Sequence, residues 1–453
     1  TIFDFLEKAT GVAYPWQNYK QVPVRDFLYA GMENTSVTIF SDAYVTDSTG
    51  FADRNYVNVN AHELAHQWFG NLVTAKSGTH HWLQEGFATY YALLAEREIF
   101  GDDHYYRKLH ESAEQLMALS AQNAGERLLD STASSLTFYE KGAWALHILR
   151  EYIGNEAFKN GIKSYITTYR FAVADTGDLI REMEKASGKA LDEFVETWLK
   201  GKIFPEEEAL RSLQKNPFLN RLLQLKKETS EAAVLSVFSE KNYFPLNTEI
   251  IVRVKKHAKA HPSFYKKILR STLPKERQAV ALTLDTVPPE LKADFESLLT
   301  DKSYVTVENA LYTLWLNFPA DRKNYLDKTR GILGFSDKST ELLWLTLALA
   351  TPGYGELQKP HYYKTLSGYT SPVYPFQVRQ NAFTYLYQLQ AWSDGNLKDL
   401  VNACLHPTWQ FARSSQSLLD TLLKNPDYKR RFQDIFSELS VAEQNYLRKR
   451  TEL

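Results

Sequence analysis

The sequence of 453 residues has one cysteine, no long apolar run and no dense basic stretch. A lone Cys404 can form no disulfide within the chain and supplies no cysteine metal site, so we expect it to be a small buried residue. No segment approaches the ~18 uninterrupted apolar residues of a membrane-spanning helix, and no signal peptide opens the sequence. Basic residues such as Lys429-Arg430-Arg431 are too scattered to line a nucleic-acid groove. These absences argue against a membrane span and against a nucleic-acid partner.

The overall composition is that of a soluble globular protein, with 44% hydrophobic and 24% charged residues. The length allows two or three domains, each with its own core. Residues 1–204 contain 19 Lys and Arg against 27 Asp and Glu, whereas residues 205–453 contain 34 against 27. An acidic first part would attract a protonated amino group, although the same asymmetry is equally compatible with solvated surfaces. The compartment, cytoplasmic or exported, is not predicted by these features.

The stretch Asn60–Asn71 carries the strongest chemical signal. We expect a helix that begins with Asn58 or Asn60 as N-cap and ends near Gly70. His62 and His66 are four residues apart and project from one helix face, which is the spacing that two imidazoles need to bind one Zn²⁺. Glu63 lies beside them, where it can handle the proton of a metal-activated water. Taken alone, this motif could still be a chance match on an amphipathic helix.

A third ligand is expected from a second helix that begins near Trp82. Glu85 lies in its first turn, nineteen residues after His66, and the intervening residues 72–81 are long enough for an antiparallel return. A catalytic zinc keeps three protein ligands and one open position. Glu85 can therefore complete the site from a facing helix, although an isolated Glu at a helix start is usually only a favourable dipole charge.

Three motifs in this order resemble the gluzincin aminopeptidases of the aminopeptidase N type, a family that includes the leukotriene-hydrolase branch. The motifs are Gly31-Met32-Glu33-Asn34, the H-E-x-x-H stretch with Glu85, and Tyr139-Glu140-Lys141-Gly142. The resemblance extends from about Tyr14 to about Pro205.

The resemblance implies a site with one Zn²⁺ per chain and a set of named roles. It assigns His62, His66 and Glu85 as metal ligands, Glu63 as general base and Tyr139 as the phenol that stabilises the oxyanion. Glu33, Met32 and Gly31 are expected to bind the substrate, with Glu33 holding the free α-ammonium of a peptide and so making the enzyme an exopeptidase. The expected partner is a peptide substrate with a free N-terminus.

Several positions depart from the family pattern. Ala30 and Gly31 precede Met32, where the family usually has Gly first, and Ala92 stands where many relatives carry an acidic residue that orients a zinc ligand. Another group must then accept the hydrogen bond of a metal-binding histidine. Gln84 replaces a more frequent Asn, which is a milder change. The remaining histidines near the motifs, His80, His81 and His147, are interpreted as structural.

For the fold, we predict an α+β catalytic domain over residues 1–204, thermolysin-like and mainly helical with a small sheet. Lys20–Val24 and Val37–Phe40 read as strands, and Ile2–Thr10 as a helix that Gly11 ends. Residues 205–453 show degenerate helical repeats and predict an all-α HEAT-like superhelix. Residues 353–374 are expected to form a long loop. The N-terminal β-domain of the family has no counterpart here and is expected to be missing from this sequence.

Together these features predict a zinc-dependent aminopeptidase that removes N-terminal residues from peptides through a zinc-activated water. Three alternatives stay open. They are a leukotriene-hydrolase-like epoxide hydrolase, an endopeptidase, and an inactive fragment that acts as an interaction scaffold.

Overall fold

A computed structural model describes residues 1–451, which are mostly helical and divide into two compact units. The first unit comprises residues 1–23, 29–40 and 56–249, and the second comprises residues 24–28, 41–55 and 250–453. The sequence-based boundary at residues 204 and 205 stays a prediction of domain organisation, although the helices over residues 206–249 pack with the first unit.

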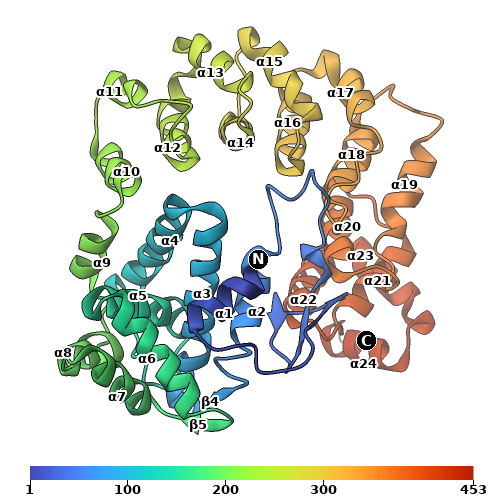
Figure 1. The fold of residues 1–453 in the computed structure, drawn as a ribbon. Helices are drawn as coiled ribbons and strands as arrows, with labels where there is room; N and C mark the ends of the chain where they lie inside the picture. Colours follow the sequence, from blue (N-terminus) through green and yellow to red (C-terminus); the bar gives the residue numbers. More distant parts are fainter. Residues whose placement is uncertain (452–453) are drawn as a thin grey trace. The chain divides into compact units, whose positions relative to one another are not determined.

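The first unit begins with a short helix and a small sheet (Figure 1). Helix α1 (Ile2–Thr10) ends at Gly11 in the left-handed conformation with φ of 68°, as predicted from the glycine. Strands β1 (Lys20–Val24), β2 (Gly31–Met32) and β3 (Val37–Ser41) form a sheet in the order β1-β3-β2. Because β2 is an edge strand, antiparallel to β3, Gly31 lies opposite Phe40 and has no strand partner on its other side within this sheet.

The centre of the first unit is helix α3 (Trp82–Phe100), which packs against α2 (Val57–Ala65), α4 (Asp102–Ala121) and α5 (Gly142–Ile153). It is buried over most of its circumference, from Trp82 to Glu96, and a helix that is apolar all round belongs in a core. The other helices and strands of this part are β4 (Val73–Ala75), α6 (Asn155–Thr168), β5 (Ala172–Ala174), α7 (Thr176–Ser187) and α8 (Asp192–Phe194). Two π-helical segments, Thr137–Lys141 and Val195–Lys200, interrupt this series.

The predicted ends of the first metal-binding helix are wrong. Helix α2 begins at Val57 after Tyr56, so neither Asn58 nor Asn60 is its N-cap, and it ends at Ala65 rather than near Gly70. The Nδ2 of Asn58 donates a hydrogen bond to Glu96 Oε2 at 2.8 Å, and this tertiary contact replaces the capping role expected from its residue type. His66 still has right-handed helical angles, so both histidines remain on one face.

Further helices follow in chain order. The first unit continues with α9 (Glu206–Leu213), α10 (Pro217–Lys227), α11 (Glu231–Ser236) and the start of α12 (Phe244–Val254). The second unit contains α13 (Pro262–Leu269), α14 (Pro274–Thr283), α15 (Lys292–Glu296), α16 (Tyr304–Asn317), α17 (Arg322–Thr329), α18 (Ser339–Ala350), α19 (Lys359–Gly368), α20 (Phe376–Leu389), α21 (Asp394–Ala403), α22 (Trp409–Leu423), α23 (Pro426–Asp434) and α24 (Val441–Thr451).

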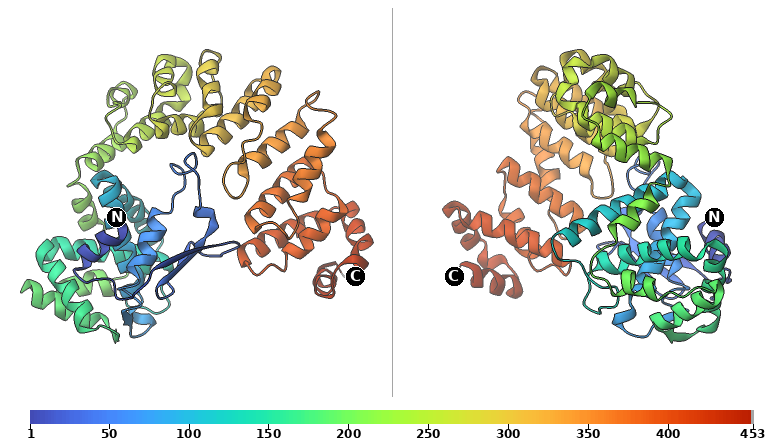
Figure 2. Two further views of the ribbon diagram at one scale, coloured as in Figure 1. Left: turned by 45° about the vertical axis from the view of Figure 1, so that its right-hand side comes forward. Right: turned by 90° about the vertical axis from the view of Figure 1, so that its left-hand side faces the viewer.

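Within the second unit each helix packs mainly on helices close to it in sequence, such as α16 on α18 and α20 on α22 (Figure 2). Two loops from the beginning of the chain are also part of this unit. Asp26 accepts a hydrogen bond from Phe376 N at the start of α20 at 2.7 Å, and Asp53 accepts one from Ser303 Oγ before α16 at 2.9 Å. Carboxylates at helix N-termini are favourable because of the helix dipole.

The long loop predicted over residues 353–374 is wrong, because α19 occupies its middle. Pro360 stands in the first turn, where a proline is tolerated, and Tyr362 and Leu366 lie buried on one face four residues apart. The prediction relied on Gly353 and Gly355 at the start of this segment and missed the short amphipathic pattern that follows them. The buried state of Cys404, by contrast, is confirmed.

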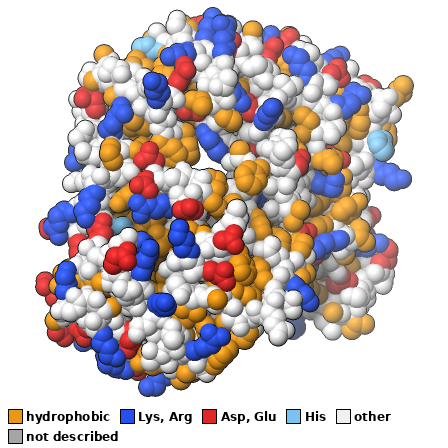
Figure 3. All heavy atoms as spheres, viewed as in Figure 1, with side chains coloured by type: hydrophobic (Ala, Val, Ile, Leu, Met, Phe, Trp, Pro, Cys, Tyr) orange, Lys and Arg blue, Asp and Glu red, His pale blue; other side chains and the backbone are white. Residues whose placement is uncertain are grey.

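The coarse fold class is confirmed as mainly helical with small sheets. A HEAT-like arrangement of the second unit stays a prediction. Among residues 1–451, no helix is both long and apolar enough to cross a membrane. On the face drawn in Figure 3, acidic and basic side chains are interspersed.

Candidate metal centre

Three predicted ligands converge on one point in the first unit. His62 Nε2 and His66 Nε2 lie 3.1 Å apart, and Glu85 Oε2 lies 3.4 Å from the first and 3.3 Å from the second. Helix α2 contributes both imidazoles, and the first turn of α3 contributes the carboxylate. The two helices pack closely against each other.

These separations fit a tetrahedral ion. With metal–ligand bonds of about 2.0–2.1 Å, two ligands at the tetrahedral angle stand about 3.3 Å apart. Glu85 Oε2 is buried and accepts no hydrogen bond from the described residues, which would be costly without a cation. Burial by itself would raise the pKa of Glu85, but the adjacent His62 and His66 imidazoles outweigh it and lower the pKa, so the carboxyl is held ionised. Two imidazoles and one carboxylate are a donor set suited to Zn²⁺.

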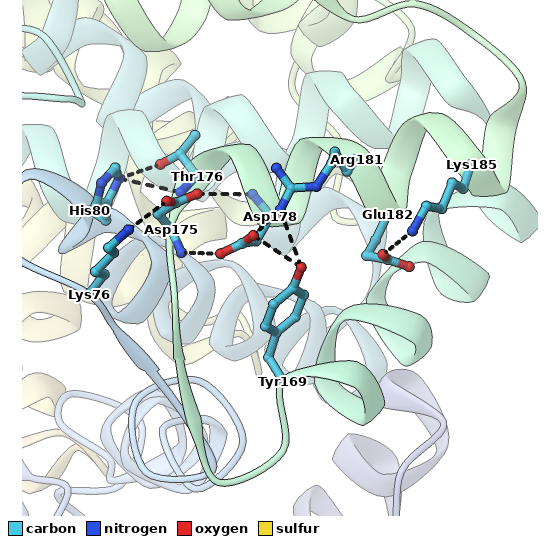
Figure 4. A network of polar contacts seen from close by, with 9 residues as sticks. All are labelled: Lys76, His80, Tyr169, Asp175, Thr176, Asp178, Arg181, Glu182 and Lys185. Carbon is cyan, nitrogen blue, oxygen red and sulfur yellow. Dashed lines mark hydrogen bonds and ion pairs between the residues drawn. The ribbon is translucent and has the colours of Figure 1, made fainter.

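The linker between the two ligand helices is fixed by the network in Figure 4. Strand β4 in this linker pairs in parallel with β5, and the following residues contact the start of α7. His80 Nδ1 lies 3.0 Å from Thr176 Oγ1, to which Trp82 Nε1 also donates at 3.0 Å. Lys76 forms an ion pair with Asp175 at 3.4 Å. These contacts set where α3 begins, and hence where Glu85 lies, and they give His80 a structural role.

A backbone carbonyl orients one of the histidine rings. His66 Nδ1 lies 2.9 Å from Phe69 O, so a proton on Nδ1 leaves the Nε2 lone pair for an ion. Ala92, which stands where relatives carry an acidic group, is buried, and its methyl side chain cannot accept a hydrogen bond from a histidine. The missing acceptor is therefore supplied from the turn after α2, for which no side-chain pattern exists in the sequence.

Two neighbours of the third ligand help to hold it. His81 Nε2 lies 3.5 Å from Glu85 Oε1, the oxygen that does not face the two imidazoles. Gln84 Oε1 accepts a hydrogen bond from Ala75 N in β4 at 3.0 Å. The substitution of Asn by Gln at position 84 thus retains an acceptor for the linker backbone.

The Glu63 carboxylate lies against Gly31 in the edge strand β2 and within 4.8 Å of a ring nitrogen of His66. A Cβ added at Gly31 would lie only 2.3 Å from Glu63 Oε1, so the absent side chain of Gly31 makes room for this carboxylate. Glu63 is buried, and burial together with the charge of Glu33 raises its pKa to about 8. A carboxyl with so high a pKa is a stronger base than an ordinary glutamate.

Glu33 lies on the same side as Glu63. The loop that carries it is bound to the end of α2, since Asn71 Nδ2 donates to Glu33 O at 2.7 Å and Ser36 N donates to Gln67 Oε1 at 2.8 Å. One ligand atom each from Glu33, Glu63 and His66 lie within 4.8 Å of one another. An exposed Met32 borders the same cavity.

Tyr139 approaches the centre from a π-helical turn before α5. Its ring stacks on His62 with a centroid distance of 5.5 Å and an interplanar angle of 8°. Burial, and then the negative charge of Glu85, raise the pKa of Tyr139, so the phenol stays protonated and can donate. Close contact of α3 with this turn depends on two glycines, because a Cβ on Gly142 would lie 2.8 Å from Gly86 Cα.

A cavity of about 590 Å³ brings these predicted residues together. Sequence reasoning missed the wall formed by one face of α4, namely Lys108, Glu111, Ser112 and Gln115. These residues lie at helical spacings of three and four, but a polar helix face usually faces solvent, so nothing in the sequence singled them out. His147, interpreted as packed, is buried elsewhere, between Tyr105 OH and Ser212 Oγ at 2.8 Å each.

The first part of the chain is similar to known proteins. Residues 1–198 match the peptidase family M1 domain. Aminopeptidase M1-D of Oryza sativa subsp. japonica is 33% identical over 207 residues, which are 42% of this chain and 23% of that protein. Aminopeptidase M1 of Arabidopsis thaliana is 32% identical over 217 residues, which are 45% and 24%. This chain thus spans only about a quarter of the length of these relatives.

Among solved structures, native yeast LTA4 hydrolase aligns with 93% of this chain and 61% of its own, with a TM-score of 0.51 and 18% sequence identity. This likeness concerns the fold alone. The match of residues 1–198 to the peptidase family M1 domain confirms the resemblance to gluzincin aminopeptidases that was predicted from three motifs.

Proposed function

We propose that this chain is a zinc-dependent aminopeptidase that hydrolyses the first peptide bond of substrates with a free N-terminus. The main support is the convergence of His62 Nε2, His66 Nε2 and Glu85 Oε2 at mutual distances of 3.1 to 3.4 Å. Aminopeptidases among the relatives of residues 1–198 agree with this proposal.

His62, His66 and Glu85 would hold the ion, which when bound supplies a Lewis acid and a water acidic enough to attack a carbonyl. Glu63, with its raised pKa, would take the proton of the attacking water and pass it to the leaving amine. The Tyr139 phenol would donate a hydrogen bond to the developing oxyanion. Glu33 would bind the substrate ammonium and so place the first peptide bond, rather than any later one, at the reacting position.

The lining of the cavity favours a peptide over a lipid epoxide. Most of its residues are polar or charged, including Asn58, Ser112, Gln115, Ser135 and Glu140. A long acyl chain would leave such groups without hydrogen-bond partners, which costs free energy. The edge strand β2 beside Glu33 could also accept an extended peptide as an additional strand.

For the rest of the chain we propose that helices α13 to α24 form HEAT-like pairs, and that residues 1–204 and 205–453 are the functional domains. Packing of each helix mainly on its sequence neighbours supports a repeat arrangement.

The proposed activity is tested with aminoacyl anilides, with N-acetylated forms of the same substrates and with a lipid epoxide. We expect hydrolysis of the free-amine anilides alone, its loss on incubation with a zinc chelator and its return on addition of Zn²⁺. Hydrolysis of the acetylated substrates would favour an endopeptidase, and conversion of the epoxide would favour the leukotriene-hydrolase alternative. Protein that binds no stoichiometric zinc would favour the scaffold alternative.

A further inference from the structure

The wall of the cavity that faces the metal centre from α4 carries four polar side chains on one helix face. Lys108, Glu111, Ser112 and Gln115 are spaced by three, four and seven residues, so they lie one above another along the helix. The adjoining face of α4 is apolar, with Leu109, Ala113 and Leu116 buried. A substrate in the cavity therefore meets a polar surface on this side.

The two charged side chains of this wall, Lys108 and Glu111, differ in whether they are free to bind a substrate. Glu111 is neutralised by an ion pair with Arg107 at 2.5 Å, on the same helix. Lys108 forms no ion pair within 4.0 Å and no hydrogen bond with any residue in the part of the chain that the structure describes, although Glu140 and Glu96 are near enough to interact with its charge. It is also the one Lys or Arg among the described residues that line this cavity, against five glutamates. A half-buried ammonium that is not engaged in an ion pair or hydrogen bond can still bind an anion.

Lys108 and Glu33 act on different parts of the cavity. The charge of Glu33 affects the pKa values of His62, Glu63 and Tyr139. The charge of Lys108 instead affects those of Glu140 and Glu96. A substrate held by its ammonium at Glu33, with its first carbonyl at the metal centre, must continue away from Glu33. The α4 wall lines the same cavity and would then border the residue after the scissile bond, which lies about 3.5 Å further along the substrate.

We propose that Lys108 is a specificity-determining residue that binds a carboxylate on the leaving-group side of the substrate. This carboxylate is either the side chain of Asp or Glu at the second position or the terminal carboxylate of a dipeptide. The inference depends on the proposed aminopeptidase function and adds a substrate class to it. Attraction between Lys108 and such a carboxylate adds binding energy that a neutral second residue lacks.

The test uses pairs of substrates that differ in charge and little in shape. Leu-Asp-amide is compared with Leu-Asn-amide, and Leu-Gly with Leu-Gly-amide, so the two pairs separate a side-chain carboxylate from a terminal one. The measured quantity is the ratio of kcat/KM within each pair, in the zinc-loaded full chain. We expect the charged member of at least one pair to be favoured roughly tenfold, as for a hydrogen bond to a charged group.

Three variants complete the design. Lys108→Met should reduce the ratio of kcat/KM for the charged over the neutral member to about one. Lys108→Glu should bring this ratio below one and should favour Leu-Lys-amide over Leu-Asp-amide. Lys159→Met, which removes an exposed lysine that does not line this cavity, should keep the wild-type ratio. A ratio unchanged by both substitutions of Lys108, or a wild-type ratio near one in both pairs, would overturn the role of Lys108 while leaving the aminopeptidase proposal intact.

Binding provides a second measurement that does not need turnover. Calorimetric titration of the same substrate pairs into zinc-loaded Glu63→Gln protein should give the same preference, again lost in the double variant with Lys108→Met. If the wild type hydrolyses none of these substrates but the preference in binding depends on Lys108, the proposed activity fails and the carboxylate site stands. Equal binding within both pairs rejects the carboxylate site.

Discussion

At the scale of single residues, the candidate site depends on the immediate surroundings of the Glu63 carboxylate. Its carboxylate is buried beside Glu33 and fits against the backbone of Gly31, where a side chain would collide with it. The raised pKa of Glu63, about 8, follows from burial first and from the charge of Glu33 after it. Its proposed role as a base thus depends on two neighbours that sequence motifs had associated only with the substrate.

Replacement of Glu63 by Gln should separate catalysis from metal binding. Gln retains the shape of Glu but cannot accept a proton, and Glu63 is not one of the three predicted ligands. We expect kcat to fall by about 10²- to 10⁴-fold with one zinc per chain retained. Turnover of aminoacyl anilides and metal content by atomic emission are the measurements, and retained turnover would remove Glu63 from its role.

Gly31→Ala should impair turnover through Glu63. The new Cβ would lie 2.3 Å from Glu63 Oε1, so the carboxylate must move, and a displacement of about 1 Å can cost up to about 10²-fold in rate. Gly368→Ala is a matched control, because no atom lies within 4 Å of the Cβ it would add. Equal kcat values for wild type and Gly31→Ala would show that the position of Glu63 tolerates the added methyl group.

His147 makes stability depend on pH. Burial lowers its pKa to about 4 in the folded chain, whereas an exposed His in the unfolded chain titrates near ~6.5. Between these values only the unfolded state takes up the proton, so stability present above pH ~6.5 is lost as the pH falls toward ~4. The loss amounts to up to about 3 kcal/mol. Urea unfolding from pH 7 to 4.5 should show this slope, and His147→Gln should reduce it by about one proton.

At the scale of elements, helix contacts bring the motifs together. The Tyr139 motif ends in Gly142, and the Glu85 motif includes Gly86, and these two glycines face each other where α3 meets the turn before α5. This close approach places the Tyr139 ring against His62. The glycines are therefore required for packing as much as for any local backbone conformation.

Gly142→Ala should disturb both stability and catalysis. Its Cβ would lie 2.8 Å from Gly86 Cα. Because backbone atoms cannot move aside without disturbing the helix packing, we expect the free energy of unfolding to fall by about 1–3 kcal/mol. Displacement of Tyr139 should lower kcat more than it raises KM, because the phenol acts on the oxyanion. Gly395→Ala, where the nearest atom to the added Cβ is 3.6 Å away, should be neutral or slightly stabilising. A Gly142→Ala protein as stable as wild type would contradict this packing argument.

At the scale of the whole molecule, every residue of the candidate site belongs to the first of two compact units. An ion bound there would stabilise that unit, because its three ligands are brought together only by folding. The second unit contains none of these ligands. Metal binding should therefore affect the two units unequally.

Zinc removal should lower the unfolding midpoint of the zinc-loaded full chain. A ligand at 1,000 times its Kd contributes about 4 kcal/mol of stability, which the chelator abolishes. Differential scanning calorimetry with and without chelator measures the shift. Glu85→Gln protein, which lacks the third ligand, should show a much smaller zinc-dependent shift than wild type, and an equal shift would place the ion elsewhere.

How far the site could be predicted differs from residue to residue. His62, His66, Glu85 and Tyr139 were predictable because their spacing and order recur in a known family. Phe69 was not, since its contribution is a backbone carbonyl at 2.9 Å from His66 Nδ1, to which any residue type could contribute. The α4 wall was missed for a similar reason, because its polar face is indistinguishable in sequence from a solvated one.

The sequence by itself determined which chemistry this protein can carry, because residue types and their spacing along a helix specify potential ligands and bases. It also determined most of the elements, through apolar periodicity and the glycines and prolines at their ends. Only the tertiary structure decided that Asn58 does not cap its helix, that Gly31 makes room for Glu63, and that Lys108 lines the cavity. These features depend on contacts between segments far apart in the chain, and local pattern does not encode such contacts.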